Sequence, residues 1–490
     1  MKKYLIYIAF FSFTLMGCNS FLEVEPKGKA VLKNYEHYNG LFNNSFLGGF
    51  QFLKFTATSN AETGDMGYSF SILGEVQAPF FMSDDIVANT NTYNNYTQIQ
   101  KNMYGWKDNI YLVDDNAAEW GTMYSLNYVY NLVANGVMDA EDGTLMQKKA
   151  LLAEARISRA YMHFWTAQLF TLPYNESTAT SDLGIPLITE ANTELKDVKR
   201  ASLKETYNFI ITEIEESIDD LPNDTYNRNR VSKAAGYYIL GEVYFYMKKY
   251  DKALAALKNA KTFLQQSSIA VNLYDYNAKV PTWFISFLPN YGLFNHPNPF
   301  VSEETILVKQ SAAPIYSTLA SQTVLHNEVY NLFHASDLRL KIYSNKGFFS
   351  SSVQLPGYQR AQPGTVNYGP SVPNLVLMLA ECEARTNNLS TAEQMLLDFR
   401  QKRMPTANAS FTYTTQKDLV KIILEERQRE YAATGMRWLD MRRLVDDTEY
   451  NNLRKTRTID GQTYTLTRER LCLRIPPMTL QFNPNMIDNK

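Results

Sequence analysis

Apolar side chains recur every three or four residues through most of the chain's interior, and this spacing predicts amphipathic helices. One such run covers residues 147–170 and stops before Pro173. Another covers residues 203–221 and stops before Pro222, because proline cannot continue a helix. The periodicity therefore predicts an all-α architecture.

Two segments share the arrangement of small and large residues that is typical of a tetratricopeptide helix pair. They cover residues 230–264 and 374–399, and the equivalent positions Leu240 and Leu379 lie 139 residues apart. Tandem repeats of this type are spaced by about 34 residues. We therefore expect a scaffold of helix pairs that is interrupted by long inserts.

Helical periodicity is lost in two such inserts, at about residues 60–108 and 266–370. Both are rich in Tyr, Phe, Asn, Pro, Gly and Ser, a composition that favours irregular loops. Long irregular segments on a compact scaffold usually carry function, so we expect ligand-binding residues in the inserts.

The N-terminus reads as an export signal. Two lysines precede an uncharged, mostly apolar run over residues 4–16, which is too short to span a membrane. The next residues complete the sequence LMGC, which resembles the lipobox of bacterial lipoproteins. We therefore expect a signal peptide at 1–17, lipidation of Cys18 and a tether over 18–38. The alternative is an ordinary secretory signal that happens to contain a cysteine.

Carboxylates continue the apolar stripe of a helix that is predicted to start with a capping box at Thr415. Glu426 and Glu430 lie on this stripe, and Arg437 follows the helix stop at Gly435. A carboxylate on a buried face needs guanidinium partners. We therefore predict a structural ion-pair network of Glu426, Glu430 and Arg437, rather than an acid–base cluster.

The segment that starts at Glu426, ERQREYAATGMRWLDMRR, resembles the C-terminal signature of the SusD/RagB family of outer-membrane lipoproteins. Other motifs match the family in order along almost the whole chain. They are CNSFLEVEP from Cys18, MSDD at 82–85, Trp120 with Tyr124 and Asn131, GIPL at 184–187, and LRIPPMTLQFNPNM at 473–486. Met478 departs from the pattern, which more usually has an acidic residue there.

This resemblance implies an all-α, SusD-like fold of tetratricopeptide-like helix pairs, with a single domain over residues 39–490. It also implies a lipid-anchored, surface-exposed location at the outer membrane and a partner SusC-like TonB-dependent transporter. Family members capture oligosaccharides or, in the RagB branch, peptides. We expect an oligosaccharide ligand, with a peptide-binding protein that serves an oligopeptide transporter as the alternative.

Composition and charge sharpen the ligand class. The chain has 48 Lys and Arg against 50 Asp and Glu, a formal net charge of −2, so nothing drives it toward a nucleic-acid backbone. Aromatic residues make up 13% of the 490 residues, with 33 Tyr and 27 Phe, which exceeds what a core requires.

Sugars present apolar C–H faces to aromatic rings and hydroxyl groups to amides, and the inserts supply both partners. The candidate ligand-binding residues are Tyr93, Asn94, Tyr96, Tyr104, Trp106, Trp283, Tyr291 and Phe294. Three tryptophans on predicted helices are assigned to the core instead, namely Trp120, Trp165 and Trp438.

Signals of catalysis are missing. The sequence contains no G-x-S-x-G elbow, H-E-x-x-H motif, phosphate-binding loop or dinucleotide fingerprint, and its five histidines are scattered. We therefore expect a protein that is not an enzyme and has neither a metal site nor a cofactor. Adjacent acids such as Asp84 and Asp85 are assigned to turns and caps, and Cys382 and Cys472 to free core thiols.

Overall fold

The computed structural model describes residues 32–59, 66–115, 117–283, 295–311, 323–346, 354–361, 364–459 and 461–489. The predicted signal peptide and Cys18 lie outside these residues, as do Tyr291 and Phe294 of the second insert. None of the helices in the described part of the chain is both long and apolar enough to cross a bilayer.

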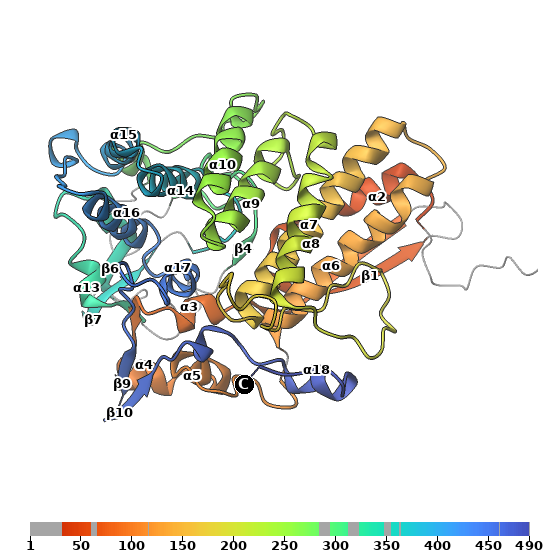
Figure 1. Ribbon diagram of the computed structural model, residues 1–490, viewed down its shortest axis with the longest axis horizontal. Helices are drawn as coiled ribbons and strands as arrows, with labels where there is room; N and C mark the ends of the chain where they lie inside the picture. Colours follow the sequence, from red (N-terminus) through yellow and green to blue (C-terminus); the bar gives the residue numbers. More distant parts are fainter. Residues whose placement is uncertain are drawn as a thin grey trace, which may run out of the picture.

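The scaffold consists of long helices that pack one against the next, from α6 at one end of the molecule to α16 at the other (Figure 1). They are α6 (Ala118–Gly136), α7 (Leu145–Phe170), α8 (Leu203–Glu215), α9 (Lys233–Tyr246), α10 (Tyr250–Leu264), α14 (Val372–Arg385), α15 (Leu389–Gln401) and α16 (Gln416–Glu430). Capping boxes start α7, α8 and α16, and the one at Thr415 confirms the sequence-based expectation. Helix α8 ends earlier than predicted, and a 3₁₀ turn (Ile218–Asp220) leads to Pro222.

Both predicted tetratricopeptide pairs are confirmed as antiparallel neighbours, α9 with α10 and α14 with α15. Their close approach depends on small residues. A Cβ atom added at Gly241 in α9 would lie 2.6 Å from Cγ of Leu257 in α10, so a larger residue would push the helices apart.

Short elements connect the scaffold helices. The short helices are α2 (Tyr35–Phe42), α3 (Ala78–Met82), α4 (Thr90–Asn94), α5 (Gln98–Tyr104), α11 (Tyr276–Trp283), α13 (Asn327–Tyr330), α17 (Arg437–Leu444) and α18 (Pro477–Phe482). The strands form antiparallel pairs, namely β1 (Gln51–Ser59) with β2 (Met66–Glu75), β3 (Ile86–Val87) with β5 (Val324–Leu325), β4 (Gln310–Ser311) with β8 (Val366–Asn367), β6 (Tyr343–Lys346) with β7 (Gln354–Arg360), and β9 (Thr456–Ile459) with β10 (Gln462–Thr465). The fold is thus all-α and tetratricopeptide-like, as the sequence predicts.

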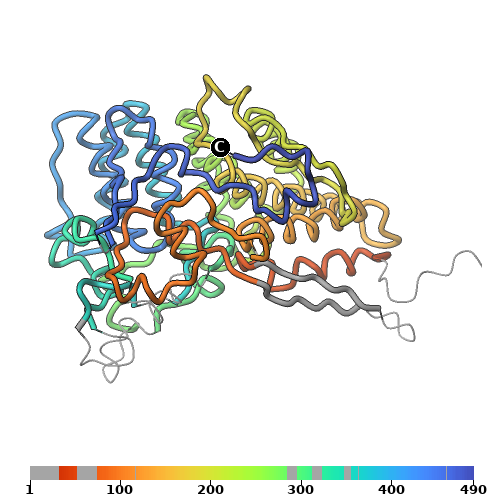
Figure 2. Tube along the Cα trace, turned by 90° about the horizontal axis from the view of Figure 1, so that it is seen from below, coloured from red at the N-terminus to blue at the C-terminus, as the bar shows by residue number. Residues whose placement is uncertain are grey.

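The two inserts contain more regular structure than their composition suggests, and they meet in space. The first insert supplies β2 and the helices α3, α4 and α5. Strand β3 of the first insert pairs with β5 of the second, and Oη of Tyr96 lies 2.6 Å from Oγ1 of Thr323. Figure 2 shows the first insert, in orange, beside the blue C-terminal segment and the blue-green second insert.

One large apolar core runs under both the scaffold and the inserts, and a smaller one fills the space between α14, α15 and α16. Trp165 and Trp438 are completely buried in the large core, as predicted.

Candidate functional site

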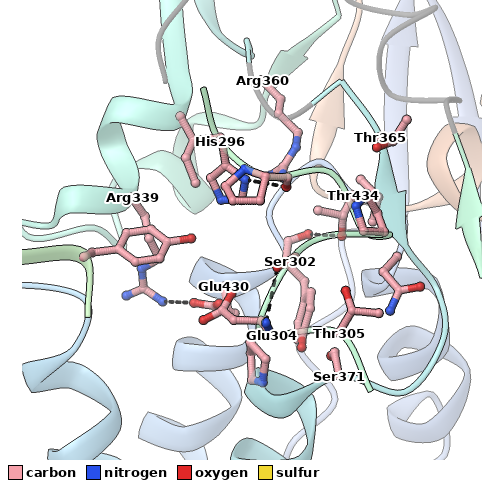
Figure 3. Close-up of a pocket in the computed structure, with 18 of the residues that line it drawn as sticks. His296, Ser302, Glu304, Thr305, Arg339, Arg360, Thr365, Ser371, Glu430 and Thr434 are labelled. Atoms are coloured by element: carbon pink, nitrogen blue, oxygen red, sulfur yellow. Dashed lines mark hydrogen bonds and ion pairs between the residues drawn. The ribbon is translucent and has the colours of Figure 1, made fainter. Parts of the chain in front are cut away.

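A cavity of about 110 Å³ lies where the second insert covers the C-terminal end of α16 (Figure 3). The insert contributes Ser302, Thr365 and Arg360, the last residue of β7, to its lining. Glu430 at the end of α16 and Thr434 just after it complete the lining from the scaffold side. Hydroxyl, carboxylate and guanidinium groups therefore surround a small hollow.

Ion pairs between four arginines and four carboxylates form a charge network, and half of its eight members also line the cavity. Glu426 bonds to Arg339 at 2.6 Å, to Arg429 at 2.7 Å and to Arg400 at 3.1 Å. Glu430 bonds to Arg403 at 2.7 Å and also to Arg339. The members of this charge network are Arg339, Arg400, Arg403, Arg429, Asp337, Glu304, Glu426 and Glu430.

The arginines keep two of the carboxylates ionised. Burial alone raises the pKa of Glu426, but Arg339, Arg429 and Arg400 overcome this and hold that pKa far below its ordinary value. The pKa of Glu430 is lowered in the same way, chiefly by Arg403. Burial raises the pKa of Glu304, and Arg403 opposes that rise only in part.

The predicted ion-pair network is confirmed for Glu426 and Glu430, but Arg437 belongs elsewhere. Its guanidinium binds Asp84 of the first insert, with 2.7 Å between Nε and Oδ1. Asp84 lies in a turn, as predicted, and its carboxylate also serves as the ion-pair partner of Arg437. This corrects the assignment of Arg437 to the network. The reason is Gly435, whose φ of +90° turns the chain away from α16 toward α3.

His296 forms part of the cavity wall and is supported from behind by Trp283. The two ring centroids lie 4.4 Å apart, and Nδ1 of His296 lies 3.0 Å from the carbonyl oxygen of Pro297. Burial lowers the pKa of His296 to about 4, so the imidazole is neutral at pH 7, and the charge of Arg360 acts in the same direction. Trp283 is buried against Tyr274 and Tyr276, which corrects the expectation that it contacts ligand.

Three candidate rings of the first insert also lie in the core. Tyr96, Tyr104 and Trp106 are at most 3% exposed. Nε1 of Trp106 donates to the carbonyl oxygen of Met82 at 2.8 Å, and the guanidinium of Arg457 lies 4.2 Å from the Tyr104 centroid and 4.1 Å from that of Trp106. Their faces are covered by protein, so stacking on a sugar is not available to them.

Two candidates of the first insert do reach the surface. Asn94 ends α4 and is exposed, and Tyr93 beside it is half-buried. The Oη atoms of Tyr93 and Tyr464 lie 3.3 Å apart, and Nζ of Lys101 lies 5.8 Å from the Tyr93 centroid. A half-open aromatic ring with an amide and a cation beside it is suited to a hydroxyl-rich ligand.

An aromatic hollow of about 230 Å³ lies on the opposite end of the scaffold, on α6. Trp120, Tyr124 and Tyr128 line it at helical spacing, with Leu195 and Met486 on the other side. Trp120 packs against the large core, with its ring centroid 4.9 Å from that of Phe170, but it is only half-buried and also lines this hollow. The spacing of four residues between the three α6 rings was a signal in the sequence that could have revealed the hollow.

The described residues offer no group of three or more His, Cys, Asp or Glu side chains placed to hold a metal ion. Cys382 and Cys472 are buried free thiols, as predicted. Burial raises the pKa of both, so neither is an activated nucleophile.

Two family models match the chain. A model described as starch-binding and associating with the outer membrane matches residues 59–245, and a model of the SusD family matches residues 373–489. Among curated proteins, SusD-like protein P2 of Formosa agariphila is 22% identical over 505 residues, covering 91% of each chain.

Solved structures with the same fold include a putative sugar-binding protein of Bacteroides vulgatus. It is 19% identical with a TM-score of 0.65, over 94% of this chain and 99% of that one. Surface glycan-binding protein A of Bacteroides uniformis is 17% identical with a TM-score of 0.64, over 85% of this chain and 94% of that one.

Proposed function

Because the chain belongs to the SusD family, we propose that it is a non-catalytic lipoprotein of the cell surface that binds oligosaccharides and delivers them to a SusC-like TonB-dependent transporter. Lipidation of Cys18 would anchor it in the outer membrane, because each buried methylene of an acyl chain contributes about 0.8 kcal/mol. The names of two similar structures, a sugar-binding and a glycan-binding protein, support this ligand class.

The observation that carries the proposal is the meeting of the two inserts through β3 and β5. The first insert brings the half-open ring of Tyr93 and the amide of Asn94, and the second brings the polar cavity around Arg360. A ring that stacks on C–H faces and polar groups that bind hydroxyls are the two requirements of a carbohydrate site.

Isothermal titration of residues 19–490 with plant, host and microbial oligosaccharides tests the proposal. We expect binding by some of them, and Tyr93→Ala weakens it about fivefold, because a ring contact contributes about 1 kcal/mol. Tyr413→Ala is the matched control, since this half-exposed tyrosine lies outside both inserts and bonds only to Glu393 in the described structure. Silence across the whole panel would refute the proposal.

The alternative, a peptide-binding surface lipoprotein, is favoured by the aromatic hollow on α6. Its lining is mostly apolar, with Glu190 and Asn192 among its few polar residues, so an apolar peptide side chain would fit it. Mass spectrometry of material that copurifies from cells separates the two ligand classes. Peptides that are lost with Tyr128→Ala would favour the alternative.

A further inference from the structure

Arg360 differs from every other buried arginine in the described part of the chain. Eleven arginines there are at least nine-tenths buried. Ten of them bond to carboxylates, amides or backbone carbonyls, as Arg442 does with Gln168 and the carbonyl of Thr171. The side chain of Arg360 makes no hydrogen bond or ion pair with any described residue, and its Nε is buried without a partner.

The neighbouring carboxylates already form ion pairs with other arginines. In the charge network, four arginines meet four carboxylates, so the network has no negative charge left for a fifth arginine. Glu430, which lines the cavity together with Arg360, is bound by Arg403 and Arg339. The cavity therefore holds one positive charge that the described protein does not neutralise.

Backbone pairing fixes the position of this charge. Arg360 is opposite Tyr343 in the β6–β7 pair, and the next amide, that of Ala361, donates to the carbonyl oxygen of Ile342 at 2.8 Å. The side chain extends from this strand end toward His296 and into the cavity (Figure 3). A buried unpaired cation is costly, and this one is held in place rather than released to solvent.

From this geometry we propose that the cavity binds an acidic substituent of the oligosaccharide, a carboxylate or a sulfate ester, through the guanidinium of Arg360. The inference rests on the proposed function and narrows it to an acidic glycan. A guanidinium presents paired N–H donors that match two oxygens of one anionic group. Ser302 and Thr365 place hydroxyl groups in the same cavity for the sugar itself.

Pairs of oligosaccharides that differ only in charge test the inference. The probes are oligogalacturonides with their methyl esters, and sulfated carrageenan oligosaccharides with their desulfated forms, titrated into residues 19–490. We expect the acidic member of at least one pair to bind about 30-fold more tightly than its neutral form. The pair that shows this difference identifies carboxylate or sulfate as the group.

Arg360→Gln is expected to remove that difference and leave the weak binding of the neutral form. Arg360→Lys keeps the charge without the paired donors, so it should retain only part of the preference. Arg468→Gln is the matched control, because it removes a guanidinium from a half-exposed ion pair with Asp446 outside the inserts. Thermal unfolding of Arg360→Gln without ligand should be at or above the wild-type temperature, since no protein partner is lost.

Equal binding of acidic and neutral forms would overturn the inference and leave the proposed function standing. If no member of any pair bound while other neutral glycans did, the inference would be overturned and the proposed function would stand. Silence with all glycans would overturn both, as would binding of an acidic peptide in place of any glycan. A fall in the unfolding temperature of Arg360→Gln with unchanged selectivity would make Arg360 a structural residue instead.

Discussion

Buried arginines are paired with carboxylates in one region of the molecule and unpaired in the region next to it. In the charge network at the end of α16, Glu426 and Glu430 each meet at least two arginines, and every arginine meets a carboxylate. In the cavity beside it, Arg360 meets none among the described residues. Complete pairing is what a stable scaffold requires, whereas an unpaired group is retained where a ligand can complete it.

The largest effect is expected from breaking the charge network. Glu426→Gln removes the carboxylate that Arg339, Arg400 and Arg429 share. Arg339 keeps Asp337 and Glu430, but the other two arginines lose their one carboxylate partner in the described structure. The free energy of unfolding should fall by about 3–5 kcal/mol, measured by urea denaturation. Glu425→Gln is the control, because this neighbour on α16 is half-exposed and forms no ion pair with any described residue.

Glu425→Gln should change stability by less than about 0.5 kcal/mol. If the two variants were equally stable, the network would contribute no more than an exposed charge, and the contrast with the cavity would disappear.

A second prediction compares the pH dependence that two histidines give to stability, His163 in the buried scaffold and His296 in the cavity wall. Burial lowers the pKa of His163 in α7 to about 4, below the value of about 6.5 in the unfolded chain. As pH falls, the unfolded state therefore binds the proton first. The contribution of His163 to the free energy of unfolding is complete above pH 6.5 and is lost progressively toward pH 4. Between pH 7.5 and 4.5, His163→Gln should lose about 2 kcal/mol less stability than the wild type.

The pKa of His296 in the cavity is lowered in the same direction, so its contribution to stability is lost over the same pH range. If the second insert unfolds together with the scaffold, His296→Gln should flatten the pH dependence as His163→Gln does. A flattening by His163→Gln alone would mean that the insert opens separately. No flattening by either variant would contradict the lowered pKa of both rings.

The scaffold could be predicted from the sequence because its signals are local. The pair α9–α10 follows from positions such as Gly241 and Leu257, which lie within one segment, and the cap at Thr415 involves a residue three positions away. The C-terminal helices and the stop at Gly435 were found for the same reason.

The site could be predicted only in part because its partners are distant in sequence. Arg339 lies 87 residues before Glu426, and Asp84 lies 353 residues before Arg437. The prediction that Arg437 pairs with the two glutamates is therefore wrong, because it considers only residues that are close in sequence. Tyr93 and Tyr104 lie in the same Tyr- and Asn-rich insert, so composition cannot tell them apart. The fold buries Tyr104 and leaves Tyr93 half-exposed. That Arg360 has no partner among the described residues can be recognised only from the hydrogen bonds and ion pairs of the folded chain.

The smallest effect on stability, and the sharpest test of the contrast, is expected at Asn94. Its exposed side chain makes no hydrogen bond in the described structure, and only its carbonyl oxygen accepts one, from Nζ of Lys101 at 3.0 Å. Asn94→Ala should therefore leave the free energy of unfolding within about 0.5 kcal/mol of wild type. Affinity for a bound oligosaccharide should nevertheless fall about fivefold, because one amide hydrogen bond to a sugar hydroxyl is lost. A residue that contacts the ligand but does not support the fold should change affinity and leave the free energy of unfolding unchanged. Glu426→Gln should instead lower the free energy of unfolding. Unchanged titration with Asn94→Ala would place the ligand away from α4 and leave the second insert as the binding region.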